Sequence, residues 1–525
     1  MVFYVTISLL LIFINQIYFL KYVYLYQLES YDILHFIKII FKRYDLLDYV
    51  FYISNIVLFV LSVMFDCETL LLILCIENLV IFAVKLSKYC KNYSNSKIKF
   101  KYTKRVLRNN LLFIIIEFMT ISIVFTTKIY LLLSILVVNL LTFLISSILI
   151  IPIEKTIYNQ YIKKAQKVID NNKNIKIIAI TGSYGKTSVK NILYEILSQK
   201  YNVLATPMSY NTPMGICKCV LSELKPFHEY LILEFGAKRV GEIKYLCDKF
   251  KPNYAIISSI GPQHLETFGS IENIVKTKME LFDFIDEKSN CVCNISNSYI
   301  CEYFESHHCD CLKVDFADNG CVCDKTIKNT LQILEIKCTK NGSYFTICCN
   351  NEIEKYNTKL IGAHNVVNVC LAIAMSKKIG LSYGQIVQGL SNVSSIKHRL
   401  EIKDMGEYLL IDNSYNSNPS SFRCAIDALC LFSDLIKVVI TPGVIDQGVN
   451  AYKANFDLGK YMANKVDYVY VVNKTNRLAL LDGLNCGEME DERIIVVDSF
   501  SDINFRDFGE GEVVLIENDL PDNFV

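Results

Sequence analysis

Residues 175–191 read IKIIAITGSYGKTSVKN, and this stretch decides the fold of the chain. A short β-branched run is typical of a buried strand, a glycine loop follows it, and the next residues have helical spacing. Strand, loop and helix in this order form the context in which a glycine loop binds phosphate. The standard loop has a glycine five places before the glycine that precedes the lysine, but Ile180 stands there. The stretch therefore predicts a shortened phosphate-binding loop.

Each residue type in this loop has a chemical reason to be there. Gly182 and Gly185 let backbone N–H groups approach phosphate oxygens. Lys186 can reach the β- and γ-phosphates, and the Thr187 hydroxyl can bind Mg²⁺. Ser188 offers a reserve hydroxyl. The predicted nucleotide-binding residues of the loop are Gly182, Ser183, Gly185, Lys186, Thr187 and Ser188.

The composition divides the chain into two unlike parts. The chain has 525 residues and a formal net charge of +1, so no global field favours a nucleic-acid partner. Mean hydropathy is +0.30 although 20% of the residues are charged. The first ~150 residues are rich in Leu, Ile, Val, Phe and Tyr, and the remainder has an ordinary soluble balance.

The N-terminal part is predicted to be a membrane region of about five transmembrane helices, because its apolar segments have the length that crosses hydrocarbon. These segments are 2–19, 49–65, 69–86, 111–126 and 129–152. A cleaved signal peptide is the alternative for the first. The absence of a basic stretch before it and of a small-residue cleavage site disfavours that alternative.

Basic residues predict the orientation of this region. Residues 85–108 hold nine Lys or Arg, whereas the loop at 66–68 holds none. By the positive-inside rule the basic loop is cytoplasmic, which makes everything after Pro152 cytoplasmic too. We expect an integral, multi-pass protein of a bacterial cell membrane with its catalytic part in the cytoplasm. The basic loop either sets topology alone or also contacts anionic lipid or a lipid-linked substrate.

Apolar runs alternate with helical segments in the remainder, which predicts α/β domains with parallel sheets. A break near residues 397–401 separates two such blocks. The predicted domains are the membrane region 1–152, a central ATP-binding domain 153–396 and a Rossmann-like C-terminal domain 397–525. The Cys-rich stretch 289–359 is expected to be irregular and antiparallel.

Ten of the 20 cysteines fall between Cys291 and Cys349. A Cys-x-Cys pair in a strand places both thiols on one face, and His307 and His308 lie beside Cys309. Zinc is one interpretation. No Cys-x-x-Cys pair supports it, and a cytoplasmic chain keeps its thiols reduced. Buried thiols are the favoured interpretation.

Five further blocks follow the loop in order. They read ILEFGA (232–237), HLETFGS (264–270), GAHNVVN (362–368), HRLE (398–401) and IDNSYNSNP (411–419). With TGSYGKTS (181–188), they resemble the Mur ligase family, and within it the MurF-like branch that adds D-alanyl-D-alanine to a peptidoglycan precursor. The resemblance covers about residue 174 to the C-terminus, and the short loop is a trait of this family.

The resemblance implies a catalytic set of Lys186, Glu234, His264 and Lys278. Glu234 and His264 match the family's metal-site Glu and His, which would join Thr187 at Mg²⁺. Lys278 matches a lysine that is carbamylated in several members, and a carbamate offers carboxylate-like oxygens to the metal. An exposed helical lysine is the alternative for Lys278, and Lys276 is its rival.

The resemblance also implies contacts with the rest of ATP. Asn365 and Asn368 match a block near the adenine, although helix capping is an alternative for Asn365. Arg399 matches an arginine that reaches ATP from the third domain. Asp412 lies in a family block that has a second acid where this chain has Asn413. The C-terminal end, LIENDLPDNFV, also lacks the family's glycine- and arginine-containing turn.

The implied activity is ATP-dependent amide-bond formation through an acyl phosphate, with ATP and Mg²⁺. The amine would be an amino acid or a dipeptide such as D-Ala-D-Ala, and the acceptor a small or lipid-linked carboxylate; no nucleic acid is expected. Family members begin with a UDP-binding domain, where this chain has its apolar region. Two alternatives are a poly-γ-glutamate or folylpolyglutamate synthase type of ligase and a non-catalytic ATP-binding membrane scaffold.

Overall fold

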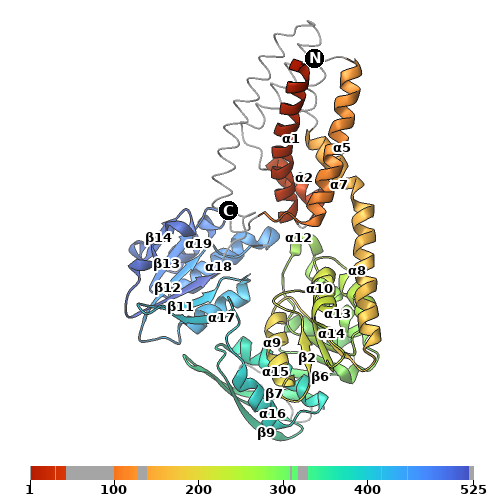
Figure 1. The fold of residues 1–525 in the computed structure, drawn as a ribbon. Helices are drawn as coiled ribbons and strands as arrows, with labels where there is room; N and C mark the ends of the chain where they lie inside the picture. The colour runs from red at the N-terminus through yellow and green to blue at the C-terminus, as the bar shows by residue number, and fades with distance from the viewer. Residues whose placement is uncertain are drawn as a thin grey trace. The chain divides into compact units, whose positions relative to one another are not determined.

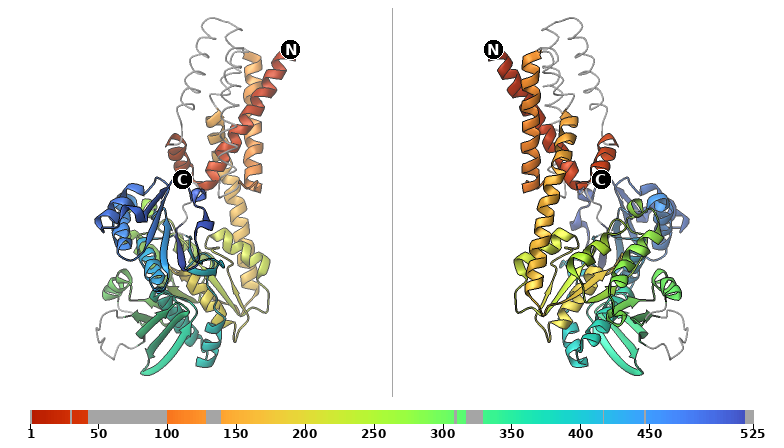
Figure 2. Two further views of the ribbon diagram at one scale, coloured as in Figure 1. Left: turned by 90° about the vertical axis from the view of Figure 1, so that its left-hand side faces the viewer. Right: turned by 90° about the vertical axis from the view of Figure 1, so that its right-hand side faces the viewer.

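The computed structural model describes residues 2–29, 31–42, 100–127, 139–307, 310–316, 329–415, 417–445 and 447–518. Described residues up to Gln160 belong to one compact unit, and those from Tyr161 onward to a second. Figures 1 and 2 show a helical first unit and a second unit built from sheets and helices.

The described part of the first unit is helical. Its helices are α1 (Val2–Leu28), α2 (Ile33–Lys42), α5 (Lys104–Thr127), α7 (Asn139–Leu149) and the start of α8 (Ile151–Asn171). They enclose a buried aromatic core in which the Phe19 and Phe113 rings lie 5.0 Å apart and the Phe36 and Phe143 rings 5.3 Å apart. Long apolar side chains that meet across helices in this way build a core from packing alone.

The predicted membrane segments meet this unit only in part. Segments 2–19 and 111–126 lie within α1 and α5, whereas segments 49–65 and 69–86 and the first part of 129–152 lie outside the described residues. Within the described part, one continuous helical stretch, Asn139–Asn171, is long and apolar enough to cross a membrane. The five spans stay a prediction.

The second unit begins with a sheet of nine strands in the order β2-β3-β1-β4-β5-β6-β7-β8-β9. The strands are β1 (Lys176–Thr181), β2 (Val203–Ala205), β3 (Tyr230–Glu234), β4 (Tyr254–Ile257), β5 (Cys291–Asn294), β6 (Leu312–Phe316), β7 (Thr330–Thr339), β8 (Gly342–Cys349) and β9 (Glu352–Thr358). Pairing is parallel from β2 to β7 and antiparallel from β7 to β9.

The Cys-rich stretch is therefore only partly as expected. It is antiparallel in β7–β9, but the expectation is wrong for β5 and β6, which extend the parallel sheet. Cys291 and Cys293 are buried in β5, and Cys311 is buried beside β6. Among the described residues, the one group of side chains with metal-ligand spacing contains no cysteine. The choice between buried thiols and zinc stays a prediction, because His308 and Cys309 lie outside the described residues.

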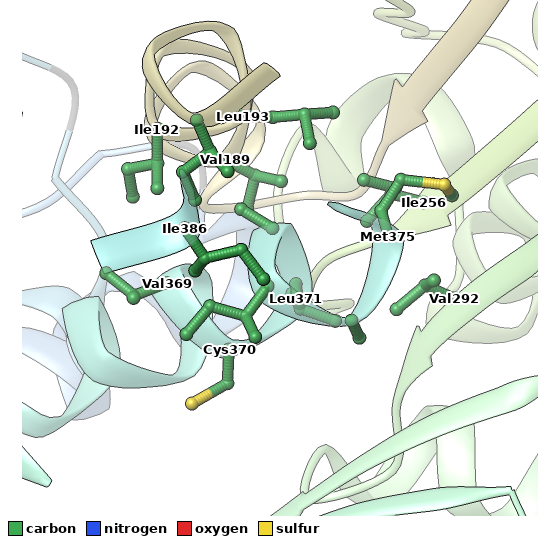
Figure 3. Close-up of a cluster of buried hydrophobic side chains, with 14 of the residues drawn as sticks. Val189, Ile192, Leu193, Ile256, Val292, Val369, Cys370, Leu371, Met375 and Ile386 are labelled. Atoms are coloured by element: carbon green, nitrogen blue, oxygen red, sulfur yellow. The ribbon is translucent and has the colours of Figure 1, made fainter. Parts of the chain in front are cut away.

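Helices pack against this sheet and place the connections between strands. They are α9 (Lys186–Leu197), α10 (Pro213–Glu223), α11 (Glu242–Phe250), α12 (Leu265–Phe268), α13 (Ile271–Phe284), α14 (Ser298–Ser306), α15 (Ala363–Ile379) and α16 (Tyr383–Asn392). Figure 3 shows Val189 and Ile192 of α9 packing with Val369 of α15 and Ile386 of α16. This core fixes α9, and therefore fixes the loop in front of it.

A second sheet follows, with the strand order β10-β11-β15-β12-β13-β14. Its strands are β10 (Glu401–Asp404), β11 (Leu409–Asn413), β12 (Ile436–Thr441), β13 (Tyr468–Val472), β14 (Ile494–Val497) and β15 (Glu512–Glu517), and its helices are α17 (Pro419–Leu429), α18 (Ala451–Ala463) and α19 (Arg477–Cys486). Only β10 pairs antiparallel. The predicted α/β architecture is confirmed for this unit, while the exact domain limits stay predictions.

Candidate active site

The predicted phosphate loop has the backbone geometry that phosphate binding needs. Strand β1 ends at Thr181, helix α9 begins at Lys186, and Gly185 between them has φ 80°. Gly182 has φ 150°, and a Cβ there would lie 2.2 Å from the Ser258 hydroxyl. Both positions therefore require glycine. The loop leads into a helix N-terminus, where unpaired N–H groups favour an anion.

Lys186 lies against this loop. Its ammonium donates to the carbonyls of Gly182 at 2.8 Å and Ser183 at 3.0 Å. Burial lowers the pKa of Lys186 to about 8, and the Glu234 carboxylate opposes that shift. The loop thus keeps a cation in close contact with its own backbone.

Glu234 and Thr187 come together from strand β3 and helix α9. Glu234 is the last residue of β3 and is 1% exposed. Its Oε2 accepts from the Thr187 hydroxyl at 2.9 Å, and its Oε1 accepts from the Asn211 amide at 3.2 Å. A hydroxyl and a carboxylate side by side are the hard oxygen donors that Mg²⁺ prefers, so these residues fit the implied metal.

Two residues of this cluster were not predicted from the sequence. Lys190 is fully buried, and its ammonium lies 3.4 Å from Glu234 Oε2 and donates to the Met208 carbonyl. Asn211, in the connection before α10, is the other. The spacing of Lys190 from Lys186 is one helical turn, which puts both on one face; that signal was available. No local pattern marks Asn211.

The charges in this cluster do not cancel. Arg399 reaches Thr187 Oγ1 at 3.5 Å, and its guanidinium lies 5.0 Å from the Tyr415 ring centre. Burial lowers the pKa of Arg399, and the Glu234 carboxylate opposes that shift. Three cations, Lys186, Lys190 and Arg399, thus face one buried acid. An anionic ligand would restore the balance.

Lys278 is not an exposed helical lysine. It is 3% exposed on α13, whereas its rival Lys276 is exposed. Burial lowers the pKa of Lys278 to about 7, and the Lys186 charge lowers it further. A neutral amine is what carbamylation requires.

His264 follows β4 as expected from the sequence. It precedes α12 with φ 55°, a left-handed conformation that non-glycine residues rarely adopt. It lies two residues beyond Pro262, whose carbonyl is bonded to the phosphate loop. Its role at a metal stays a prediction.

The two asparagines of α15 differ in their surroundings. Gly362 caps the helix, so the capping alternative for Asn365 is wrong; its amide donates to the Ile361 carbonyl at 2.9 Å. Asn368 lies against the phosphate loop, since a Cβ on Gly185 would meet its Oδ1 at 2.5 Å. The structure therefore brings Asn368 to the loop from a distant helix.

Asp412 lies in a polar cluster of the second sheet. Burial raises the pKa of Asp412, but hydrogen bonds from Lys403, Ser414 and His398 outweigh burial and hold the pKa at about 2. His398, Glu401 and Asp412 have metal-ligand spacing. The Lys403 ammonium, however, lies 2.6 Å from Asp412 and 3.1 Å from Glu401, so a lysine already supplies the cation there.

Asn413 stands where the family has a second acid, and in the structure a carboxyl group from elsewhere in the chain lies beside it. The Asn413 amide donates to Glu517 Oε2 at 2.7 Å, and the Ser417 hydroxyl donates to Glu517 Oε1. Glu517 ends β15 and is fully buried. The carboxyl group beside Asn413 therefore comes from a strand about a hundred residues away. Hydrogen bonds from Ser417 and Asn413 only partly offset burial, which raises the pKa of Glu517 to about 8.

A model of the Mur ligase middle domain matches residues 180–376. The UDP-N-acetylmuramoyl-tripeptide–D-alanyl-D-alanine ligase of Escherichia coli (strain K12) is 30% identical over 302 residues, which are 57% of this chain and 65% of that enzyme. The chain thus spans just under two thirds of that relative's length.

Solved structures give the same fold. MurF from Acinetobacter baumannii superposes with a TM-score of 0.59 at 24% identity, over 69% of this chain and 77% of that one. MurF from Thermotoga maritima in complex with ADP gives a TM-score of 0.58 at 22% identity, over 69% and 80%. These likenesses show that the chain has the Mur ligase fold over about two thirds of its length.

Glu517 makes the stability of the chain depend on pH. Its pKa in the folded protein, about 8, lies above the unfolded value of about 4.3. The folded state therefore keeps a proton that the unfolded chain releases, and the free energy of unfolding should fall as pH rises from about 5 to about 8. Glu517→Gln should flatten this slope in urea denaturation at several pH values. Exposed Glu510→Gln is the matched control; a flat wild-type curve would contradict the assignment.

Proposed function

Because the chain is a MurF-like member of the Mur ligase family, we propose that it is an ATP-dependent carbon–nitrogen ligase of peptidoglycan synthesis. It would join a dipeptide such as D-Ala-D-Ala to a carboxylate of the cell-wall precursor. The observation that carries the proposal is the Thr187–Glu234 contact at the phosphate loop, surrounded by Lys186, Lys190 and Arg399. The E. coli relative carries that ligase name, and the T. maritima MurF binds ADP.

The proposed reaction has two steps, formation of an acyl phosphate and then of the amide. An acceptor carboxylate oxygen attacks the γ-phosphorus, an O–P bond forms, and ADP leaves. The amine nitrogen then attacks the acyl carbon, phosphate leaves, and the nitrogen loses a proton. Bound Mg²⁺ would supply charge neutralisation at the phosphates.

The chain's own residues account for the rest. The Gly182–Gly185 loop amides and Lys186 would hold the transferring phosphoryl group and stabilise its charge. Thr187 and Glu234 would hold the metal, with His264 and Lys278 beside them. Arg399 and Asn368, which lie beside the loop, would hold the nucleotide and help exclude water from the acyl phosphate.

The decisive assay follows phosphate release by the purified full chain with ATP and Mg²⁺. UDP-linked and lipid-linked muramoyl-tripeptide acceptors are offered, each with and without D-Ala-D-Ala, and glutamate is offered as a rival amine. Release that needs both acceptor and dipeptide is expected. Lys186→Ala should reduce it about hundredfold or more, and exposed Lys276→Ala should leave it unchanged. Nucleotide binding without turnover under any pairing would favour the scaffold alternative.

Lys278 gives a separate prediction. Its lowered pKa, about 7, leaves a neutral amine that can attack CO₂, forming an N–C bond and releasing a proton. Activity should therefore fall as pH drops below 7 and as CO₂ is removed. The Lys278→Ala variant should have low activity that does not depend on CO₂, while the activity of the Lys276→Ala variant should keep its dependence on CO₂. A carbamate signal from ¹³C-labelled bicarbonate should appear in the wild type only. A CO₂-independent wild type would exclude the carbamate.

The proposed location is a bacterial cell membrane, with several spans and the catalytic part in the cytoplasm. The apolar segments of residues 1–152, the nine basic residues at 85–108 and the helical stretch Asn139–Asn171 support it. The chain should stay in membranes washed with alkaline carbonate, and a C-terminal fusion should be active only as a cytoplasmic reporter. Release by carbonate would contradict a spanning region.

A further inference from the structure

The segment 258–262, which leads from β4 towards His264, is bonded to the phosphate loop along its length. The Ser259 carbonyl accepts from the backbone N–H groups of Ser183 at 2.6 Å and Tyr184 at 3.4 Å. The Ser183 hydroxyl donates to the Gly261 carbonyl at 3.0 Å and accepts from the Gly261 N–H at 3.2 Å. The Ser258 hydroxyl donates to the Tyr184 carbonyl. The two segments are therefore held as one piece of structure.

The Tyr184 side chain makes the last of these links. Its hydroxyl donates to the Pro262 carbonyl at 3.1 Å. Its ring covers Gly261 so closely that a Cβ there would lie 2.6 Å from Tyr184 Cε2. Burial raises the pKa of Tyr184, which keeps the hydroxyl a donor. One end of this link is two residues before Lys186, and the other is two residues before His264.

His264 needs such support because of its backbone. Its φ of 55° costs free energy for a side chain with a Cβ, and that conformation persists only where surrounding structure holds it. Hydrogen bonds from Thr267 and Phe268 to the His264 carbonyl hold it from the α12 side. The Tyr184–Pro262 hydrogen bond holds the same turn from the phosphate-loop side, at the point nearest His264.

We propose that Tyr184 is a positioning residue that fixes His264 relative to the phosphate loop and thereby sets the affinity for the nucleotide-bound divalent cation. The inference rests on the proposed function, which puts His264 at the metal. Tyr184 would not touch the metal or the reacting atoms. It would act by keeping the imidazole and the loop in one fixed geometry, so that binding does not have to order them.

The test removes one oxygen atom. Tyr184→Phe should weaken binding of Mn²⁺, titrated by electron paramagnetic resonance in the presence of ADP, about threefold to tenfold, as expected for one hydrogen bond. Metal-free ADP binding should stay at its wild-type value, and the melting temperature should fall by no more than the loss of one hydrogen bond explains. Tyr194→Phe, on a partly exposed tyrosine of α9, is the matched control and should change nothing.

A double-mutant cycle separates positioning from packing. If Tyr184 acts through His264, Tyr184→Phe should not weaken Mn²⁺ binding any further in a His264→Ala background. If its role is purely structural, Tyr184→Phe should weaken Mn²⁺ binding equally in the wild-type and His264→Ala backgrounds. Equal losses in both backgrounds, unchanged Mn²⁺ affinity, or weaker metal-free ADP binding would each overturn the inference alone. A wild-type chain that binds no Mn²⁺ with ADP would instead overturn the proposed function and this inference with it.

Discussion

The site of the second unit depends on the hydrogen bonds that hold the buried carboxylate of Glu234. A charged group taken out of water is costly unless partners replace its hydration. Thr187, Lys190 and Asn211 are those partners, and they come from a helix and a connection outside β3. These three residues donate to Glu234, and among the described residues no other carboxylate forms an ion pair with Lys186 or Arg399. That surplus of buried positive charge is the physical argument for a polyphosphate ligand.

The sheet explains why these groups meet. Strand β1 lies between β3 and β4, with Ile180 opposite Glu234 and Thr181 opposite Ile257. All three strands run in the same direction, so their carboxyl ends deliver the phosphate loop, Glu234 and the His264 segment to one edge. Helix α9 starts at that edge and is fixed from behind by α15 and α16. The core therefore determines how rigidly the loop is presented.

The sequence predicted what local pattern can encode. Strand β1, its loop and α9 followed from periodicity and glycine placement, and Glu234 followed from its position at a strand end. Long-range partners were out of reach: Asn413 and Glu517 are 104 residues apart, and nothing near either residue marks the other. The error at β5 has a similar cause. All four of its residues are buried, and a strand buried on both faces has no alternation from which direction could be judged.

Arg399 shows how such long-range contacts shape the site. Its two neighbours, His398 with φ 62° and Leu400 with φ 49°, both have left-handed backbones. The His398 N–H is held by the Glu401 carboxylate at 3.1 Å, and the Leu400 N–H by Asn413 Oδ1 at 3.1 Å.

Asn413 can do this because Glu517 fixes the other end of its amide. An aspartate at position 413 would have no N–H to donate to Glu517 Oε2, and its charge would make ionisation of that buried acid still less favourable. Asn413 and Glu517 are therefore one arrangement: Glu517 orients the amide, and the amide holds the strained turn that directs Arg399 towards Thr187.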